Sequence, residues 1–290
     1  MAMDDLTLTS TVTLSNGVEM PRFGLGVYKS EPGAETENAV RIALKLGYPA
    51  VDTAAFYRNE ADVGRAVREF RATAGAGAMS GAAYGVFVTT KLWNSDQGYD
   101  ETLRAFDRSL DELGMEQVDL FLVHWPKPDL MADTWRALER LYQEQRCRAI
   151  GVSNFEPHHL EMLSVHANVA PVVNQVELHP YLQQRAVCEY CADHDIVVTA
   201  WSPIARGRVV DDPVLREIGA AHGKSAVHVA LRWELQREIV TIPKSVHEER
   251  IASNMELYDF SLSDEEMKRI DGLDRGEEMR LGPHPDHIDF

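Results

Sequence analysis

The sequence has few cysteines, no long hydrophobic run and no excess of basic residues. Three cysteines, Cys147, Cys188 and Cys191, among 290 residues are too few for a disulfide framework in a chain long enough to bury its own core. The first ten residues lack the basic and apolar regions of a signal peptide, and no apolar run approaches the roughly 20 residues of a membrane helix. We therefore expect a cytoplasmic protein that makes no membrane contact.

Positive charge is scarce: 29 Lys and Arg stand against 46 Asp and Glu, for a formal net charge of -17. A field of this sign repels polyanions, so the composition excludes a general binder of nucleic acids or anionic membranes. The sequence also lacks the Rossmann dinucleotide fingerprint, because Gly24-Leu25-Gly26 is not followed by the third glycine. Any phosphate that the protein binds must be held by a local basic cluster.

Eight short apolar or β-branched runs alternate with helical patterns along the chain. The helical periodicity is clear where Leu103, Phe106, Leu110 and Leu113 share one face. Alternation of strand and helix indicates a parallel sheet, and eight units in 290 residues favour a (β/α)8 TIM barrel; an open doubly wound sheet is the alternative. The candidate strands lie at 22–28, 49–52, 85–91, 118–124, 149–153, 171–175, 196–200 and 239–242.

Other segments surround the barrel pattern. Asn16-Gly17 between the runs 11–14 and 18–20 predicts a β-hairpin, which we expect to plug the bottom of the barrel. The Ala/Gly-rich stretch 72–83 predicts a flexible surface loop. Residues 276–290 form a C-terminal tail that we expect to serve as a substrate loop. No linker divides the chain, so we expect one domain over 1–290.

Polar or aromatic side chains end seven of the strand runs. In a barrel of this kind the site lies at the carboxyl ends of the strands, so these side chains are candidates to meet. Unpaired polar groups after buried runs cost several kcal/mol, which makes a purely structural role for all of them together improbable. The residues are Asp52, Lys91, His124, Ser153, Asn154, Gln175, Trp201, Ser202, Lys244 and Ser245.

Three of these side chains, together with Tyr57, suggest a proton-transfer device. Asp52 can pair with Lys91, and Tyr57 lies on the loop that follows Asp52. A nearby ammonium should lower the pKa of the Tyr57 phenol from about 10 and make it a usable general acid. His124 could donate a hydrogen bond to the same developing oxyanion. This constellation suits the reduction of a carbonyl group, whose oxygen must be polarised and protonated while hydride reaches its carbon.

Hydride needs a donor, and the segment after the last strand offers a place for one. Lys244, Ser245 and Arg250 form a basic patch near a helix start, a setting suited to a phosphate monoester. A 2′-phosphate would make Arg250 useful, so the pattern favours NADP(H) over NAD(H). The Trp201 indole could stack on a nicotinamide, whose carboxamide could be bound by Ser153, Asn154 and Gln175.

These residues lie in motifs that resemble the aldo-keto reductase family from about Val12 onward, including GYPAVDTAAFYRNE, LFLVHWP, AIGVSNF, VNQVELHP and IPKSVHEERIASN. The nearest branch resembles the short 2,5-diketogluconate reductases and prostaglandin F synthases. The resemblance implies a (β/α)8 barrel, a monomer, and NADP(H)-dependent reduction of a small carbonyl substrate, prostaglandin and keto-sugar activities included. It places the catalytic tetrad on Asp52, Tyr57, Lys91 and His124, nicotinamide contacts on Ser153, Asn154, Gln175 and Trp201, and adenosine phosphate contacts on Lys244, Ser245, Arg250 and Asn254.

The substrate-facing candidates and the rival functions remain open at this point. Aromatic walls suit apolar and sugar-like carbonyl compounds alike. One rival is a Schiff-base lyase with Lys91 as nucleophile, although an Asp52 partner would keep that amine protonated. Another is a cofactor-binding sensor with negligible turnover. The candidates for substrate contact are Val27, Tyr28, Trp93 and Trp125.

Two histidine pairs, His158-His159 and His284 with His287, could suggest a metal site. Adjacent side chains on a helix point in different directions, and the second pair lies in a tail without further ligands. We therefore expect no metal.

Overall fold

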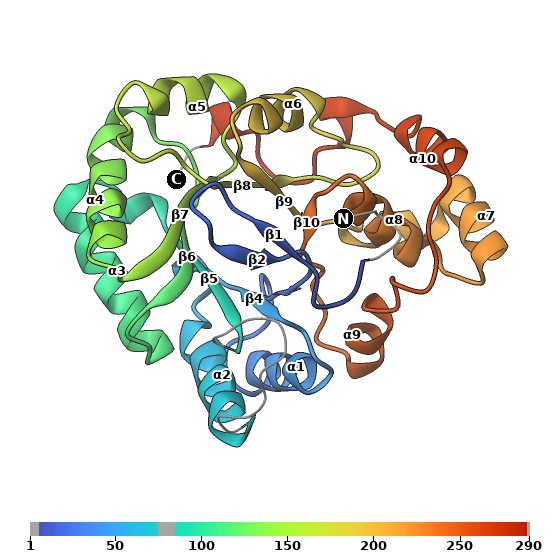
Figure 1. Cartoon of the computed structure of the whole chain (residues 1–290), viewed down its shortest axis with the longest axis horizontal. Coiled ribbons are helices and arrows are strands. Elements are labelled where there is room, and N and C mark those ends of the chain that lie inside the picture. Colours follow the sequence, from blue (N-terminus) through green and yellow to red (C-terminus); the bar gives the residue numbers. More distant parts are fainter. Residues whose placement is uncertain (1–5, 75–84, 289–290) are drawn as a thin grey trace.

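The computed structural model describes residues 6–74 and 85–288 and shows a closed parallel barrel (Figure 1). Hydrogen bonds join its strands in chain order from first to last. Parallel bridges from Phe23 to Thr241 and from Gly26 to Lys244 connect the two edges, so the prediction of a (β/α)8 barrel is confirmed. The strands are β3 (Leu25–Gly26), β4 (Ala50–Asp52), β5 (Phe87–Leu92), β6 (Val118–Val123), β7 (Cys147–Ser153), β8 (Val173–Glu177), β9 (Val197–Trp201) and β10 (Val240–Thr241).

Helices surround the barrel (Figure 1). In α3 the buried face includes Phe106, Leu110 and Leu113, as the periodicity predicts, and Gly114 ends the helix in the left-handed conformation. No helix within the described residues is long and apolar enough to cross a membrane. The helices are α1 (Ala34–Lys45), α2 (Glu60–Ala74), α3 (Tyr99–Leu113), α4 (Met131–Gln143), α5 (Pro157–Ser164), α6 (Arg185–Asp193), α7 (Pro213–His222), α8 (Ala226–Gln236), α9 (Glu248–Asn254) and α10 (Asp264–Asp271).

The N-terminal hairpin closes the bottom of the barrel, as predicted. Its strands β1 (Thr11–Thr13) and β2 (Glu19–Pro21) pair antiparallel around the Asn16-Gly17 turn. Leu14 and Met20 from this hairpin are buried in one cluster with apolar side chains of the barrel strands. The interior is therefore filled from below by side chains, and the polar strand ends lie at the opposite mouth.

Two segments outside the barrel, the predicted loop 72–83 and the C-terminal tail, are only partly described by the structure. The helix α2 continues through Ala74, so the first three residues of the predicted loop 72–83 are helical, and 75–83 lie outside the described residues. The C-terminal tail is described to residue 288 and contains single 3₁₀ turns at Gly276–Met279 and Pro285–His287. All three cysteines are free, as expected.

Candidate active site

The four side chains of the predicted proton-transfer device meet at the barrel mouth. Asp52 is the last residue of β4, Lys91 lies near the end of β5, and His124 directly follows β6. Tyr57 belongs to the 3₁₀ turn Ala55–Tyr57 that follows β4. Neighbouring parallel strands end at the same rim, so residues that are 72 positions apart in sequence, from 52 to 124, can share one site.

Lys91 is the centre of this group. Its side chain is 0% exposed, and its Nζ lies 2.5 Å from Asp52 Oδ1, 2.9 Å from the Thr53 carbonyl oxygen and 3.3 Å from Tyr57 Oη. An ammonium has three donors, so these contacts can occupy all of them. The second Asp52 oxygen, Oδ2, accepts a hydrogen bond of 2.7 Å from Gln175 Nε2. The carboxylate is thereby fixed on both sides, and it fixes Lys91.

The expected lowering of the Tyr57 pKa is wrong. Burial raises the pKa of this phenol well above its ordinary value of 10.0, and the charge of Asp52 raises it further. Removing water destabilises the phenolate, and the Lys91 charge that would favour it is largely compensated by Asp52 at 2.5 Å. Tyr57 therefore keeps its proton throughout the neutral range and is a proton donor rather than a base.

His124 is held as a neutral imidazole. It is 7% exposed, and burial together with the nearby Lys91 charge lowers its pKa well below the ordinary 6.5. Its ring makes edge contacts with Tyr57 and Trp93, at centroid distances of 5.6 and 5.2 Å. A neutral imidazole still has one N–H, so His124 can donate a hydrogen bond to an oxygen beside Tyr57 without bringing a second positive charge.

A second cluster of hydrogen-bonded polar side chains lies beside the tetrad at the barrel mouth. Asn154 accepts a 2.8 Å hydrogen bond from Trp201 Nε1 and donates one of 2.9 Å to the His124 carbonyl oxygen. Ser153 Oγ donates to the Gln175 carbonyl oxygen at 2.7 Å. The structure thus connects the four residues predicted to hold a nicotinamide, and through Gln175 and Asn154 it links them to Asp52 and His124.

The predicted phosphate-binding residues lie on the segment that follows β10. Lys244 is half-buried, Ser245 is buried and accepts a 3.1 Å hydrogen bond from the His247 N–H, and Arg250 is exposed on α9. The first turn of α9 is acidic, so an anion here would depend on Lys244 and Arg250 rather than on the helix terminus. The further candidates are Asn254, which is buried, and Ser202, which is half-buried after β9 in the left-handed conformation with φ 54°.

Glu177, the last residue of β8, is a site residue that the sequence did not reveal. It is 0% exposed, and its carboxylate accepts hydrogen bonds from the N–H groups of Leu281 and Gly282 at 2.6 and 2.8 Å. The tail is thereby fastened over the strand ends, where Gly282 lies against the Trp201 ring. The only signal was an acidic residue ending a buried strand in VNQVELHP, since its partners lie more than 100 residues away.

Gly282→Ala should destabilise this contact. A Cβ on Gly282 would lie 2.6 Å from the Trp201 ring and 3.1 Å from Glu177 Oε2, so the tail or the indole must move. We expect a loss of about 1–3 kcal/mol in the free energy of unfolding, measured by urea denaturation. Gly272→Ala is the matched control, because its Cβ would come no closer than 3.3 Å to another atom. Equal stability of the Gly282 variant and the wild type would contradict the contact.

The predicted substrate contacts divide into two pairs. Val27 is 0% exposed within the hydrophobic core, so its predicted role in facing substrate does not fit the structure. Trp125 is also buried, at 7% exposed. Tyr28 is 43% exposed and contacts the Tyr57 ring, and Trp93 stacks at 3.8 Å on Phe56, an exposed aromatic that the sequence did not single out. The aromatic wall beside the tetrad therefore consists of Tyr28, Phe56 and Trp93.

Comparison with known proteins identifies the family. The model of the Aldo/keto reductase family matches residues 22–275. The chain belongs to this family. Among its relatives, glyoxal reductase of Bacillus subtilis is 49% identical over 285 residues, covering 98% of this chain and 99% of the relative. The 9,11-endoperoxide prostaglandin H2 reductase of Trypanosoma cruzi is 50% identical over 281 residues, with 96% and 95% covered.

Solved aldo/keto reductase structures match the fold as well. A mutant of Gox0644, solved in complex with NADPH, superposes with a TM-score of 0.88 at 40% identity, covering 97% of this chain and 98% of that one. Membership of the aldo/keto reductase family makes the chain an oxidoreductase. The resemblance drawn from the motifs is thereby confirmed, and the similar proteins include this prostaglandin H2 reductase and a solved 2,5-diketo-D-gluconic acid reductase B, which superposes with a TM-score of 0.86 at 35% identity over 96% of each chain.

Proposed function

We propose that this aldo/keto reductase reduces aldehydes and ketones to alcohols with NADPH, and that Tyr57 is the general acid. The observation that carries the proposal is the placement of Lys91 Nζ, which touches both Asp52 at 2.5 Å and Tyr57 at 3.3 Å inside the barrel mouth. A phenol that keeps its proton and a fixed cation behind it form a device for protonating an oxygen.

The residues of the rim fit NADPH. Trp201 presents a half-buried indole beside Asn154, while Lys244 and Arg250 offer cationic side chains for phosphate groups in a chain whose net charge is negative. When bound, NADPH would supply the hydride, from the pro-R position of its C4. Trp201 would stack on the nicotinamide, with Ser153, Asn154 and Gln175 binding its carboxamide. Lys244, Ser245, Arg250 and Asn254 would hold the adenosine phosphate.

The protein itself supplies the proton that the substrate oxygen receives and the positive charge that stabilises the Tyr57 phenolate. The substrate carbonyl oxygen accepts hydrogen bonds from Tyr57 and from His124. As the carbonyl carbon is reduced, the Tyr57 proton moves to this oxygen, and Lys91 stabilises the phenolate left behind through its contact with Oη. Asp52 keeps Lys91 in place, and Tyr57 regains its proton from solvent. The product is an alcohol.

The structure supports a reductase over a Schiff-base lyase. Lys91 is 0% exposed and its three contacts occupy its donors, so no substrate carbonyl can approach the amine without breaking them. Measuring turnover distinguishes a reductase from a cofactor-binding sensor, because a sensor would bind NADPH without consuming it. All four tetrad residues are present, which favours the enzyme.

For the substrate we propose small reactive aldehydes, with prostaglandin endoperoxides and keto-sugars as the alternatives. The support is the relative named glyoxal reductase, together with the compact aromatic wall of Tyr28, Phe56 and Trp93. The test is the consumption of NADPH with glyoxal, methylglyoxal, a keto-sugar and prostaglandin H2. We expect the highest kcat/KM for the two dicarbonyls. Binding of NADPH without turnover of any carbonyl compound would overturn the proposed function.

We further propose that the enzyme acts as a cytoplasmic monomer. The tetrad, the residues that hold it in place and the tail bound to Glu177 all come from one chain. Light scattering should give a mass near 32.6 kDa, and a dimer mass would contradict the proposal.

The pH dependence of kcat/KM follows from the tetrad. Burial lowers the pKa of Lys91 below its ordinary 10.5, against the opposing effect of Asp52, so the ammonium is lost at a lower pH than that of a free lysine. Tyr57 remains protonated and His124 remains neutral through the neutral range. We expect kcat/KM to be level from about pH 6 to pH 8 and to fall on the alkaline side. A fall on the acidic side centred near 6.5 would show instead that His124 titrates.

A further inference from the structure

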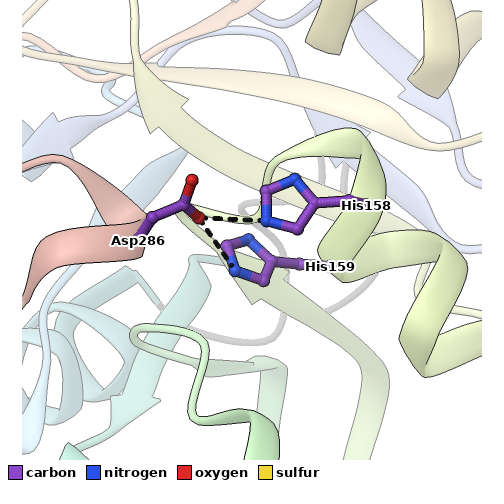
Figure 2. Close-up of side chains that lie close together, drawn as sticks. All are labelled: His158, His159 and Asp286. Carbon is purple, nitrogen blue, oxygen red and sulfur yellow. Dashed lines mark hydrogen bonds and ion pairs between the residues drawn. The ribbon is translucent and has the colours of Figure 1, made fainter.

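A cluster of metal-type side chains lies outside the tetrad, where the C-terminal tail meets the start of α5 (Figure 2). His158 and His159 stand in the first turn of α5, and Asp286 lies in the 3₁₀ turn Pro285–His287 of the tail. Asp286 Oδ1 is 3.0 Å from His158 Nε2 and 3.2 Å from His159 Nε2. Each residue offers one ligand atom, and the three atoms lie within 4.8 Å of one another.

The two histidines converge, although the sequence predicted that they point apart. Their ring centroids are 4.0 Å apart. Side chains on a helix lean toward its N-terminus, so in the first turn they extend beyond the helix end, where adjacent side chains can reach a common partner. That partner is Asp286, 128 residues further along the chain, which no local pattern could reveal.

We propose that His158, His159 and Asp286 bind a divalent transition-metal ion of the Zn²⁺ class. Two imidazole nitrogens and one carboxylate oxygen are a ligand set found at zinc sites that keep the fourth position open. Tetrahedral bonds of 2.0–2.2 Å place neighbouring ligand atoms about 3.3–3.6 Å apart, slightly more than the 3.0 and 3.2 Å observed from Asp286 Oδ1. An ion could therefore replace the two hydrogen bonds through rotation of the side chains, which also sets the spacing of the two imidazole nitrogens, now within 4.8 Å of each other.

The surroundings favour a cation and leave room for water. Glu156 and Glu277 add two carboxylates near Asp286, against one guanidinium, that of Arg280, which contacts both glutamates. The His158 side chain is 52% exposed, so the fourth ligand position opens to solvent. The site thus combines a negative local charge with the open coordination position of a three-ligand zinc site.

One hydrogen bond limits the affinity. His159 Nδ1 accepts the Glu156 N–H at 3.2 Å, so the proton of this neutral ring resides on Nε2, the atom that faces Asp286. An ion at Nε2 moves that proton to Nδ1, and the bond to Glu156 is lost. A metal-binding histidine normally donates its second N–H to an acceptor, which His159 cannot do here. We therefore expect a dissociation constant in the micromolar range.

The ion would strengthen the attachment of the tail to the barrel. Glu177 already fastens the tail at Leu281 and Gly282, beside Trp201, and the metal would add a second link at Asp286. Because the ion binds the folded tail and not a detached one, Zn²⁺ should raise the melting temperature and slow amide exchange in residues 276–288. This site is independent of the reductase proposal, since its readouts are binding and exchange rather than turnover.

The test uses the full-length protein, from which EDTA has first removed any bound metal. ZnCl₂ is then titrated into it in a calorimeter. The wild type should bind one equivalent at micromolar affinity, and His158→Gln and Asp286→Asn should each weaken binding at least 10-fold. His158 is half exposed, so its variant keeps the fold even if Asp286→Asn releases the tail. The matched control is His166→Gln, which removes an exposed histidine just beyond the same helix and should bind like the wild type.

Cobalt gives a second readout. Co²⁺ in the wild type should show the visible absorption of a tetrahedral complex with nitrogen and oxygen ligands, and this band should be absent in His158→Gln. Equal Zn²⁺ affinity of the wild type and His158→Gln would overturn the site. So would an equal loss of affinity in His166→Gln, because it would indicate adsorption to surface histidines in general.

Discussion

Replacing Tyr57 by phenylalanine should lower kcat for carbonyl reduction by about 10²–10⁴-fold, the range that a positioned general acid contributes. The substitution removes one hydroxyl group and leaves the ring to pack against Tyr28 and His124. Without that hydroxyl, the substrate oxygen loses its proton source, and Lys91 has no phenolate to stabilise. The measurement is the steady-state loss of nicotinamide absorbance with methylglyoxal, alongside NADPH affinity from the quenching of tryptophan fluorescence.

The matched control is Tyr28→Phe. Tyr28 contacts the Tyr57 ring at a centroid distance of 4.9 Å but is 43% exposed and has no contact with Lys91 among those found in the described residues. Its variant should keep kcat within a few-fold of the wild type. A Tyr57→Phe enzyme with full turnover, or equal losses in both variants, would show that Tyr57 is not the acid.

Lys91→Met should affect both stability and activity. The side chain is fully buried, and its removal leaves the Asp52 carboxylate with a single side-chain partner, Gln175. Breaking a buried ion pair in this way typically costs about 3–5 kcal/mol in the free energy of unfolding. Turnover should fall by at least the factor expected for Tyr57→Phe, because the phenolate formed at Tyr57 loses its cation. Urea denaturation and steady-state kinetics measure the two effects separately.

A double variant separates the effect of Lys91 on stability from its effect on activity. Asp52→Asn together with Lys91→Met removes both charges, so no uncompensated carboxylate remains. We expect the double variant to regain part of the lost stability and to stay inactive. Recovery of activity with recovery of stability would mean that Lys91 serves folding alone.

The sequence was most informative where a buried strand ends in a polar residue. Apolar runs predict strands, and the rim of a parallel barrel collects their ends, so Asp52, Lys91 and His124 could be placed together without knowing the fold in detail. The Asn16-Gly17 turn likewise predicted the hairpin, because few other structures suit this pair of residues. These inferences depend on short segments and on one general rule of topology.

The sequence was least informative where the outcome depends on burial or on distant partners. The direction of the Tyr57 pKa depends on how completely the neighbouring side chains exclude water, and no spacing gives this quantity. Glu177 binds the tail, and His158 and His159 contact Asp286 in the tail. In each case the partners are more than 100 residues apart in the sequence. Val27 was a candidate for substrate contact near the end of a predicted strand, yet its side chain packs into the core.

In the proposed mechanism, hydride passes from NADPH to a carbonyl carbon while the tetrad protonates the oxygen. The most direct test uses NADPH labelled with deuterium at the pro-R position of C4, with methylglyoxal as substrate and mass spectrometry of the alcohol. We expect one deuterium on the carbon that was the carbonyl, in an amount equal to the NADPH consumed. An alcohol without deuterium, or NADPH oxidised without alcohol, would contradict the mechanism.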